Sequence, residues 1–478
     1  MTAHLPLLVA CPILLALLLG LLPERAAKYG ALLLSAFPLA LAILLPAEGS
    51  WSVPWPLLPG LPVRFALHVD GLSRPLVLLT TFLVPVAILS APASLSEGRR
   101  LFHGLLLAME GLLLGTFLAA DLFLFLLFWD AVLVPMALLI GRWGGQGRPA
   151  PARAAATRFF LYAACGSVLL LAGTAWVASV AGTTGIADLT ARARTGAVLP
   201  AAAFLLFAVG FAVKVPLVPL HAWLPVAHVE APTAGSILLA GVLLKMGAYA
   251  FLRVGWGLFP NASRSYAPAL VAIAAVGAVH GALNAMAQCD IKKRIAYFSV
   301  SHMGLAMMGI FAGGICAAQG AVFHLVSHGL ATGGLFFVAG ALIERSHSRR
   351  LADQGRLAEN DPVLAVAWGV LCLSSLAVPG LAGFVGEFTV LAGVLGAYPW
   401  AAVAAGVSLV LGAAVLVPAL RQILFLAPQE GTGEWVRSGL HERVAVAALG
   451  LALLVIGLFP SWLLSLPVEA LRRLVGGA

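Results

Sequence analysis

Apolar runs of about twenty residues recur from one end of the chain to the other, separated by breaks that are charged or rich in proline and glycine. A helix of roughly 20 apolar residues is long enough to cross the hydrocarbon core of a bilayer. The pattern predicts an all-α polytopic membrane protein with about fourteen transmembrane helices. The predicted spans are 5–22, 28–46, 75–93, 101–119, 121–141, 158–181, 201–228, 232–253, 267–288, 294–313, 318–343, 361–395, 400–420 and 443–466.

Composition supports this interpretation and excludes a soluble fold. The chain has 478 residues, of which 62% are hydrophobic and only 10% are charged, whereas a soluble domain carries about 25% charged residues. Lipid must therefore cover most of the surface, and residues 1–478 are predicted to form a single membrane domain. The net charge of +9 is attributed to membrane orientation, and no nucleic-acid partner is expected.

The distribution of basic residues predicts which ends of the helices face the cytoplasm. When the predicted loops are numbered alternately, eighteen of the 28 Lys and Arg residues fall on one side, eight fall on the other and two lie inside helices. Basic residues concentrate in cytoplasmic loops. This bias predicts that both termini lie on the periplasmic side.

Two predicted spans are interrupted by proline and glycine. The seventh contains 214–225 and the twelfth contains 378–388. Proline removes a backbone donor and clashes with the preceding turn, and such breaks are tolerated in a membrane only where protein or water satisfies the backbone. Breaks in corresponding positions are typical of inverted repeats, although two unrelated proline kinks are the alternative. The predicted units are N-terminal helices 1–93, repeats of five helices each at 101–253 and 267–420, and a C-terminal helix at 443–466.

The residues that point to function are ionisable side chains inside apolar spans. A charge at the bilayer centre costs at least about 2.5–3.5 kcal/mol, so these groups should face one another or water within the bundle. Burial brings lysine and carboxylate side chains closer to titration at neutral pH, which suits proton transfer. The alternative is a set of structural ion pairs that lock helices together. The candidates are Glu110, Asp130, Lys214, Lys245, Glu387, His280, His324 and His328.

Histidine and cysteine spacing argues against a bound metal or cofactor. His324 and His328 are four residues apart and share one helical face, but no third metal ligand is evident, so they are interpreted as relay or structural groups. His302 is interpreted as a packing or relay position. The five cysteines form no paired motif and no zinc spacing with histidine. No cofactor or metal is expected in this chain.

Several long stretches resemble the M-type antiporter-like subunits of proton-pumping NADH–quinone oxidoreductase, respiratory complex I. They lie between residues 100 and 390. The length of the chain and the acid Glu387 favour the M type over the L type, which is longer and has a lysine at that position. The matching stretches are 128–140, 214–225, 228–245, 290–304 and 379–388.

The resemblance implies a proton-translocating subunit without its own redox centre, in the inner or plasma membrane of a bacterium. Partner subunits would carry FMN and iron–sulfur clusters and reduce quinone, and L-type and N-type antiporter-like subunits would be its neighbours. Multisubunit sodium/proton antiporters and membrane-bound hydrogenases use similar subunits, so these remain alternatives. A structural scaffold is a third hypothesis, which predicts that neutral replacements of the buried charges leave activity intact.

The resemblance also implies residue roles. Lys214 would be a central lysine paired with Asp130, Lys245 a connecting lysine, Glu387 a terminal acid, and Glu110 a further membrane glutamate. Protons would enter near Lys245, pass to or from Lys214 and leave by Glu387. The family normally has glutamate where this chain has Asp130, whose side chain is shorter by about 1.5 Å. We therefore expect a pair that is longer, bridged by water or rebuilt by a backbone shift.

Overall fold

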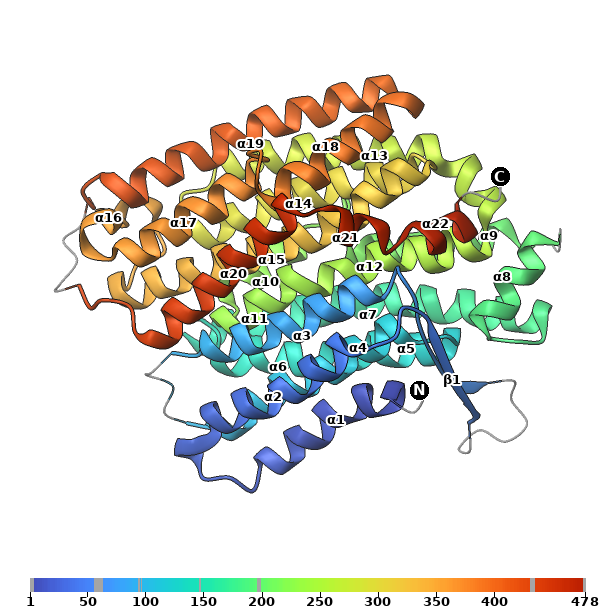
Figure 1. Cartoon of the computed structure of the whole chain (residues 1–478), viewed down its shortest axis with the longest axis horizontal. Helices are drawn as coiled ribbons and strands as arrows, with labels where there is room; N and C mark the ends of the chain where they lie inside the picture. The colour runs from blue at the N-terminus through green and yellow to red at the C-terminus, as the bar shows by residue number, and fades with distance from the viewer. Residues whose placement is uncertain are drawn as a thin grey trace.

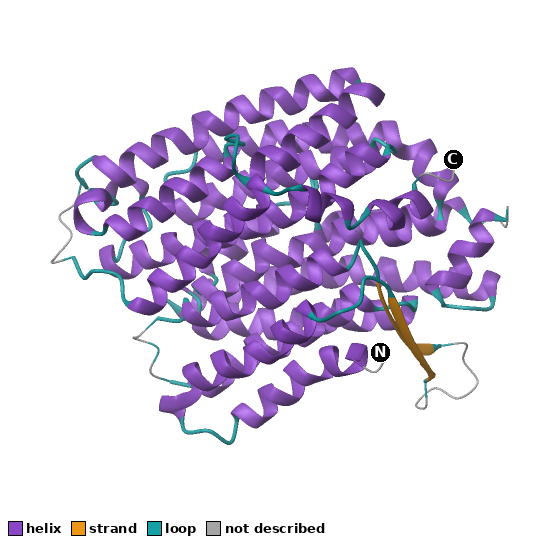
Figure 2. Cartoon of the chain, in the orientation of Figure 1, coloured by secondary structure: helices purple, strands orange, loops and turns teal. Residues whose placement is uncertain are grey.

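Long helices running side by side form almost the whole molecule (Figures 1 and 2). A computed structural model describes residues 4–55, 63–92, 95, 97–145, 148–195, 199–429 and 435–475. Residue 93, where the predicted third span ends, lies outside these ranges, as do the extreme ends of the predicted domain 1–478. Nine helical segments in the described part of the chain are long and apolar enough to cross a membrane. The prediction of a mostly helical, multi-pass membrane protein is confirmed.

The first half of the chain builds one part of the bundle (Figure 1). α5 and α6 form one nearly continuous segment, as do the two α-helical and two π-helical pieces between residues 233 and 256. The elements are α1 (His4–Leu19), η1 (Glu24–Ala26), α2 (Ala27–Ile43), α3 (Arg74–Leu89), α4 (Arg99–Leu118), α5 (Leu122–Ala131), α6 (Leu133–Trp143), α7 (Pro149–Ala181), α8 (Ile186–Arg194), α9 (Ala201–Lys214), α10 (Trp223–Glu230), α11 (Thr233–Leu238), η3 (Leu239–Leu243), α12 (Leu244–Ala250) and η4 (Phe251–Trp256).

The second half packs against the first through α14 and α15, which are buried along most of their length. The long helix α15 contacts α11, α14, α17, α18 and α20. It is therefore the central element on which the second half is assembled. The elements are α13 (Pro260–Met286), α14 (Ile291–Phe311), α15 (Ile315–Ser346), η5 (Leu351–Asp353), α16 (Leu357–Asn360), α17 (Pro362–Ser375), α18 (Ala382–Ala397), α19 (Pro399–Phe425), α20 (Leu440–Leu458), α21 (Ser461–Ser465) and α22 (Val468–Leu474).

Both proline-containing segments interrupt the helices that enclose them. The first interruption separates α9 from α10, and the indole of Trp223 donates a hydrogen bond across it to the carbonyl of Val213 at 2.9 Å. That bond satisfies one of the carbonyls left unpaired where a helix ends. The second separates α17 from α18, where Gly380 has a φ of +92°. Gly457 of α20 packs against this backbone, since a Cβ there would lie 2.5 Å from the carbonyl carbon of Leu381.

A β-hairpin between α2 and α3 corrects the all-α prediction. Strands β1 (Gly49–Pro54) and β2 (Arg64–Val69) pair antiparallel, with Trp51 opposite Leu67. Each strand is only six residues long, so a search for long apolar runs does not detect it. The hairpin lies at the same end of the bundle as α8 and the two labelled chain ends (Figure 1).

Candidate functional site

Lys245 lies at the centre of the described bundle, on a helix distorted by two π-helical segments. The side chain is fully buried. Its Nζ donates to the carbonyl of Ala240, within the π-helical turn that precedes it, and lies 2.8 Å from Nδ1 of His328. Single π-helical turns are frequent at functional sites. A charged Lys245 donates to this nitrogen, so His328 keeps its own proton on Nε2.

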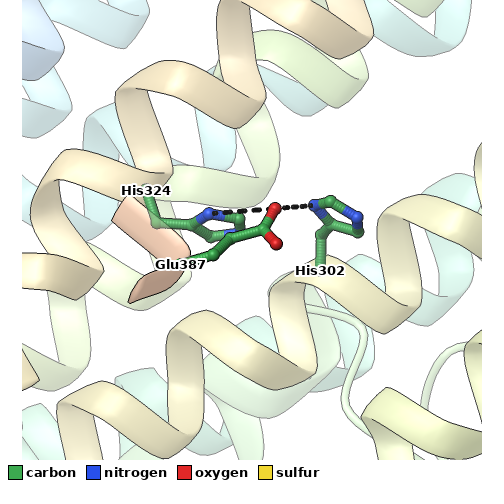
Figure 3. A group of neighbouring side chains, drawn as sticks. All are labelled: His302, His324 and Glu387. Carbon is green, nitrogen blue, oxygen red and sulfur yellow. Dashed lines mark ion pairs between the residues drawn. The ribbon is translucent and has the colours of Figure 1, made fainter. Parts of the chain in front are cut away.

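Three imidazoles continue from Lys245 toward Glu387. His328 and His324 lie one turn apart on α15, with ring centres 5.9 Å apart, and His302 of α14 lies 5.4 Å from His328 and 5.3 Å from His324. Figure 3 shows the carboxylate of Glu387, from α18, between the rings of His302 and His324. Its Oε1 is 3.5 Å from Nδ1 of His302 and 3.9 Å from Nδ1 of His324. The structure therefore brings Lys245, His328, His324 and Glu387 of the predicted set together.

Small residues let these helices approach closely enough to make the cluster. A Cβ added to Gly386, next to Glu387, would lie 2.8 Å from Cα of His324 and 3.0 Å from its Cβ. Gly320 and Gly393 make similarly close contacts between α15 and α18. Glycine at these points places the carboxylate against the histidines.

Several groups in the cluster have unused hydrogen-bonding capacity. Within the described residues, both carboxylate oxygens of Glu387, both ring nitrogens of His324 and Nε2 of His328 lack a hydrogen-bond partner. The 3.5 and 3.9 Å separations are longer than hydrogen bonds. Buried polar groups normally have hydrogen-bond partners. The atoms of this cluster that lack one are therefore available to bind a proton or a water molecule.

The cluster also contains three side chains of kinds that can bind a metal, although they are not the His324–His328 pair considered from the sequence. Donor atoms of His302, His324 and Glu387 all lie within 4.8 Å of one another. Two imidazoles and a carboxylate are a donor set that divalent metals accept. The two histidines of this group, His302 and His324, come from different helices, α14 and α15. Spacing along one helix therefore does not reveal that they meet.

The buried Lys214 and the half-buried Asp130 form a second group, but the two charges do not touch. Lys214 ends α9, is only 2% exposed, and donates a hydrogen bond to the carbonyl of Trp129 at 3.2 Å. Its Nζ also lies 4.8 Å from the centre of the Trp129 ring, which is a cation–π contact. Asp130 instead accepts a hydrogen bond from the hydroxyl of Ser167 on α7.

The resemblance implies a pair between Lys214 and Asp130, and the structure shows no direct contact between their charged groups. No ion pair of 4.0 Å or less joins them among the ion pairs of the described residues. The physical reason is the short aspartate side chain, which reaches Ser167 while the neighbouring carbonyl takes the ammonium. The expectation of a lengthened pair accounts for this geometry.

The remaining two candidates lie away from this cluster. Glu110 of α4 is fully buried and neither of its carboxylate oxygens has a hydrogen-bond partner among the described residues. His280 of α13 contacts Asn284, whose Nδ2 is 3.1 Å from its Nε2, and His221, whose ring centre is 5.1 Å away. None of these contacts connects Glu110 or His280 to Lys245 or Glu387.

Sequence reasoning missed some of the groups that complete the site. Ser167 and the carbonyl of Trp129 were not predicted, and His302 was interpreted only as a packing or relay position. The hydroxyl of Ser167 inside the predicted span 158–181 was the available signal, since polar residues in transmembrane helices usually face the bundle interior. A backbone carbonyl gives no signal in a sequence.

Comparison with known proteins assigns the family. The family described as "NADH:quinone oxidoreductase/Mrp antiporter, TM" matches residues 119–412, which is more than half of the chain. The chain belongs to this family. Within it, NADH-quinone oxidoreductase subunit M of Rhodobacter capsulatus is 39% identical over 433 residues, covering 86% of this chain and 82% of that protein.

Solved structures of the NADH:quinone oxidoreductase/Mrp antiporter family share this fold. A chain of respiratory complex I from Thermus thermophilus with bound NADH superposes with a TM-score of 0.88 at 35% identity, covering 98% of this chain and 99% of that one. A chain of the Mrp complex from Dietzia sp. DQ12-45-1b gives a TM-score of 0.85 at 25% identity, covering 99% and 98%. The family resemblance predicted from the motifs is confirmed.

Proposed function

We propose that this chain is a proton-translocating membrane-arm subunit of a bacterial NADH–quinone oxidoreductase, of the M type. The proposal is supported by the identity to subunit M proteins and by the complex I structure that it matches over nearly its full length. The observation that carries the mechanism is the buried series from Lys245 through His328 and His302 to Glu387. These titratable groups lie in succession across four helices, inside a mostly apolar bundle.

The proposed architecture has fourteen spans, with two inverted five-helix repeats at 101–253 and 267–420. The interruption between α9 and α10 and that between α17 and α18 support this assignment, because they would fall in the seventh and twelfth spans. Both termini would lie on the periplasmic side. L-type and N-type antiporter-like subunits would be the neighbours in the membrane arm.

In this mechanism the chain holds no redox centre. FMN and iron–sulfur clusters would belong to other subunits, which would transfer electrons from NADH to quinone. Energy from that reaction would change the distance between Lys214 and Asp130, and Lys214 would exchange its proton with Lys245. His328, His302 and His324 would pass the proton to or from Glu387. Neutral imidazole suits this role because one ring nitrogen accepts a proton while the other donates one.

A lysine variant tests the function directly. Lys214→Ala should reduce NADH-driven proton pumping at least tenfold, because the substitution removes the group that would exchange its proton with Lys245. The measurement is the quenching of a pH-sensitive dye in membrane vesicles, divided by the rate of NADH oxidation. Lys293→Ala, which removes a less buried lysine near the start of α14, is the matched control. Full pumping by an assembled Lys214→Ala complex would contradict the proposal.

The second candidate is a subunit of a sodium/proton antiporter, and the likeness to the Mrp complex chain favours it. In that case membrane vesicles would release protons when sodium is added, without any NADH. Subunit M function predicts instead that proton movement follows NADH oxidation and persists without sodium.

A further inference from the structure

A cavity of about 620 Å³ opens at the end of the bundle where the hairpin and α8 lie. Its walls come from the hairpin, α8, α22 and the last turns of the helix that carries Lys245. Four arginines and two aspartates line it, which leaves an excess of positive charge. The charged lining residues are Arg64, Arg194, Arg253, Arg473, Asp70 and Asp188.

The floor of this cavity is connected to Lys245 by one helix. Tyr249 and Arg253 follow Lys245 at intervals of four residues, so the three side chains lie on about the same face of that helix. The rise of 1.5 Å per residue places Arg253 roughly 12 Å beyond Lys245 along the axis. Both Tyr249 and Arg253 line the cavity. A proton moving between the outer side and Lys245 along this face would have to pass them.

Arg253 is held rigidly at that point. Its Nη2 lies 2.7 Å from Oδ1 of Asp70, and its Nε donates to the hydroxyl of Tyr249 at 3.0 Å. Asp70 is fixed in turn, because Oδ1 also accepts the backbone N–H groups of Leu72 and Ser73 at 3.0 Å. Burial alone would raise the pKa of Asp70, but the neighbouring Arg253 charge holds it well below its usual range, so Asp70 stays ionised.

The hydroxyl of Tyr249 is also held by hydrogen bonds. Its hydroxyl donates to the carbonyl of Phe117 at 2.8 Å and accepts from Arg253. Its proton is therefore directed at a backbone carbonyl of α4 and away from the cavity. A hydroxyl held in this way cannot pass a proton toward Lys245 until one of these bonds breaks.

We propose that Asp70, Arg253 and Tyr249 form a proton seal between the outer cavity and Lys245, with Arg253 as its positioning residue. The inference rests on the proposed proton-translocating function. A fixed guanidinium on the route between the cavity and Lys245 would repel protons, as positive groups do in selective pores. The seal would keep protons from returning to Lys245 from the periplasmic side while the second half of the bundle moves them.

The test measures passive proton leak in the assembled complex. Complex carrying Asp70→Asn together with Arg253→Gln is reconstituted into liposomes with an imposed pH gradient and no NADH, and the decay of the gradient is followed. The double variant removes both charges, so neither is left buried alone. We expect at least a tenfold faster decay than with the unaltered complex, at unchanged NADH oxidation with a water-soluble electron acceptor.

Three further variants separate a seal from a purely structural contact. Arg253→Lys keeps the positive charge and should leave the decay within about twofold of the unaltered complex. Adding Lys245→Ala to the double variant should abolish the leak, because the leak must run through Lys245. Arg192→Gln removes an exposed arginine of α8 that is outside the cavity lining, and no leak is expected from it.

Each contrary outcome overturns the inference. No leak in an assembled double variant means that Arg253 does not block protons, and an equal leak in Arg253→Lys means that loosened packing is the cause. A leak that persists with Lys245→Ala means that the path lies elsewhere. Pumping by Lys245→Ala alone tests the proposed function separately, so failure of the function and failure of the seal give different results.

Discussion

The two buried lysines of the candidate site, Lys214 and Lys245, are stabilised mainly by uncharged groups. Lys245 contacts a carbonyl and an imidazole, and Lys214 contacts a carbonyl and the face of an indole. These partners satisfy ammonium hydrogen bonds in a site where an unpaired charge costs several kcal/mol. A neutral partner does not fix the lysine in its charged form. We therefore expect both lysines to bind and release a proton, which a structural ion pair would oppose.

Asp130 is the residue whose substitution is most informative. Asp130→Glu should retain pumping, because the longer side chain reaches past the Trp129 carbonyl toward Lys214. Asp130→Asn should lower pumping about tenfold, since it removes the charge that acts on Lys214. For scale, any two unit charges about 7 Å apart interact by roughly 2 kcal/mol at an effective dielectric of 20. The measurement is the number of protons moved per NADH oxidised in membrane vesicles.

Ser167→Ala is the control for that experiment. It removes the hydroxyl that donates to Asp130 but leaves the charge, so pumping should fall less than twofold. If Asp130→Asn pumps as well as the unaltered protein, Asp130 has no electrostatic role toward Lys214.

At the scale of elements, the contact between α15 and α18 decides whether Glu387 reaches the histidines. Gly386→Ala would place a methyl group 2.8 Å from Cα of His324, and overpacking of this kind costs about 1–3 kcal/mol. We expect α18 to move away from α15, pumping to fall severalfold, and the complex to inactivate at a lower temperature. Pumping assays and thermal inactivation of the purified complex measure both effects.

Gly396→Ala, on the same helix, is the matched control. A Cβ there meets nothing within 4 Å, and alanine favours a helix over glycine by about 1 kcal/mol. Pumping and stability should be unchanged or slightly improved. Equal losses in both variants would show that the helix tolerates no substitution, and that the glycine contact with His324 is not the cause.

The sequence predicts these elements better than it predicts how they meet. Apolar runs and prolines locate the long helices and the interruptions, because each signal is local. The hairpin is not predicted, because six-residue strands contain no long apolar run. The meeting of Glu387 with His302, and the turn of Asp130 toward Ser167, depend on how three or four helices pack. Glu110 and His280 were grouped with the others by residue type alone, and packing places them elsewhere.

At the scale of the whole molecule, arginines are paired with acids at both ends of the bundle. At one end Arg345 pairs with Glu442 at 2.8 Å, and Arg349 pairs with Glu230 at 3.3 Å and with Asp290 at 3.5 Å. At the other lie the hairpin, α8 and both labelled chain ends (Figure 1). Acids compensate the arginines at both ends, so the ion pairs themselves do not define the orientation. The excess of basic residues in one set of loops predicts the orientation, because the positive-inside rule counts Lys and Arg rather than net charge.

This orientation predicts the behaviour of reporter fusions. Alkaline phosphatase fused after Ala478 should be active, because it folds only in the periplasm, and a green fluorescent protein fused there should stay dark. Fusions after Ala427, in the connection between α19 and α20, should behave in the opposite way, since Arg421, Arg437 and Arg443 flank that connection and hold it in the cytoplasm. Enzyme activity and fluorescence, each divided by the amount of fusion protein, provide the measurement. Active phosphatase at both positions would mean that an even number of spans separates Ala427 from Ala478, and the assignment of the basic loops to the cytoplasm would have to be abandoned.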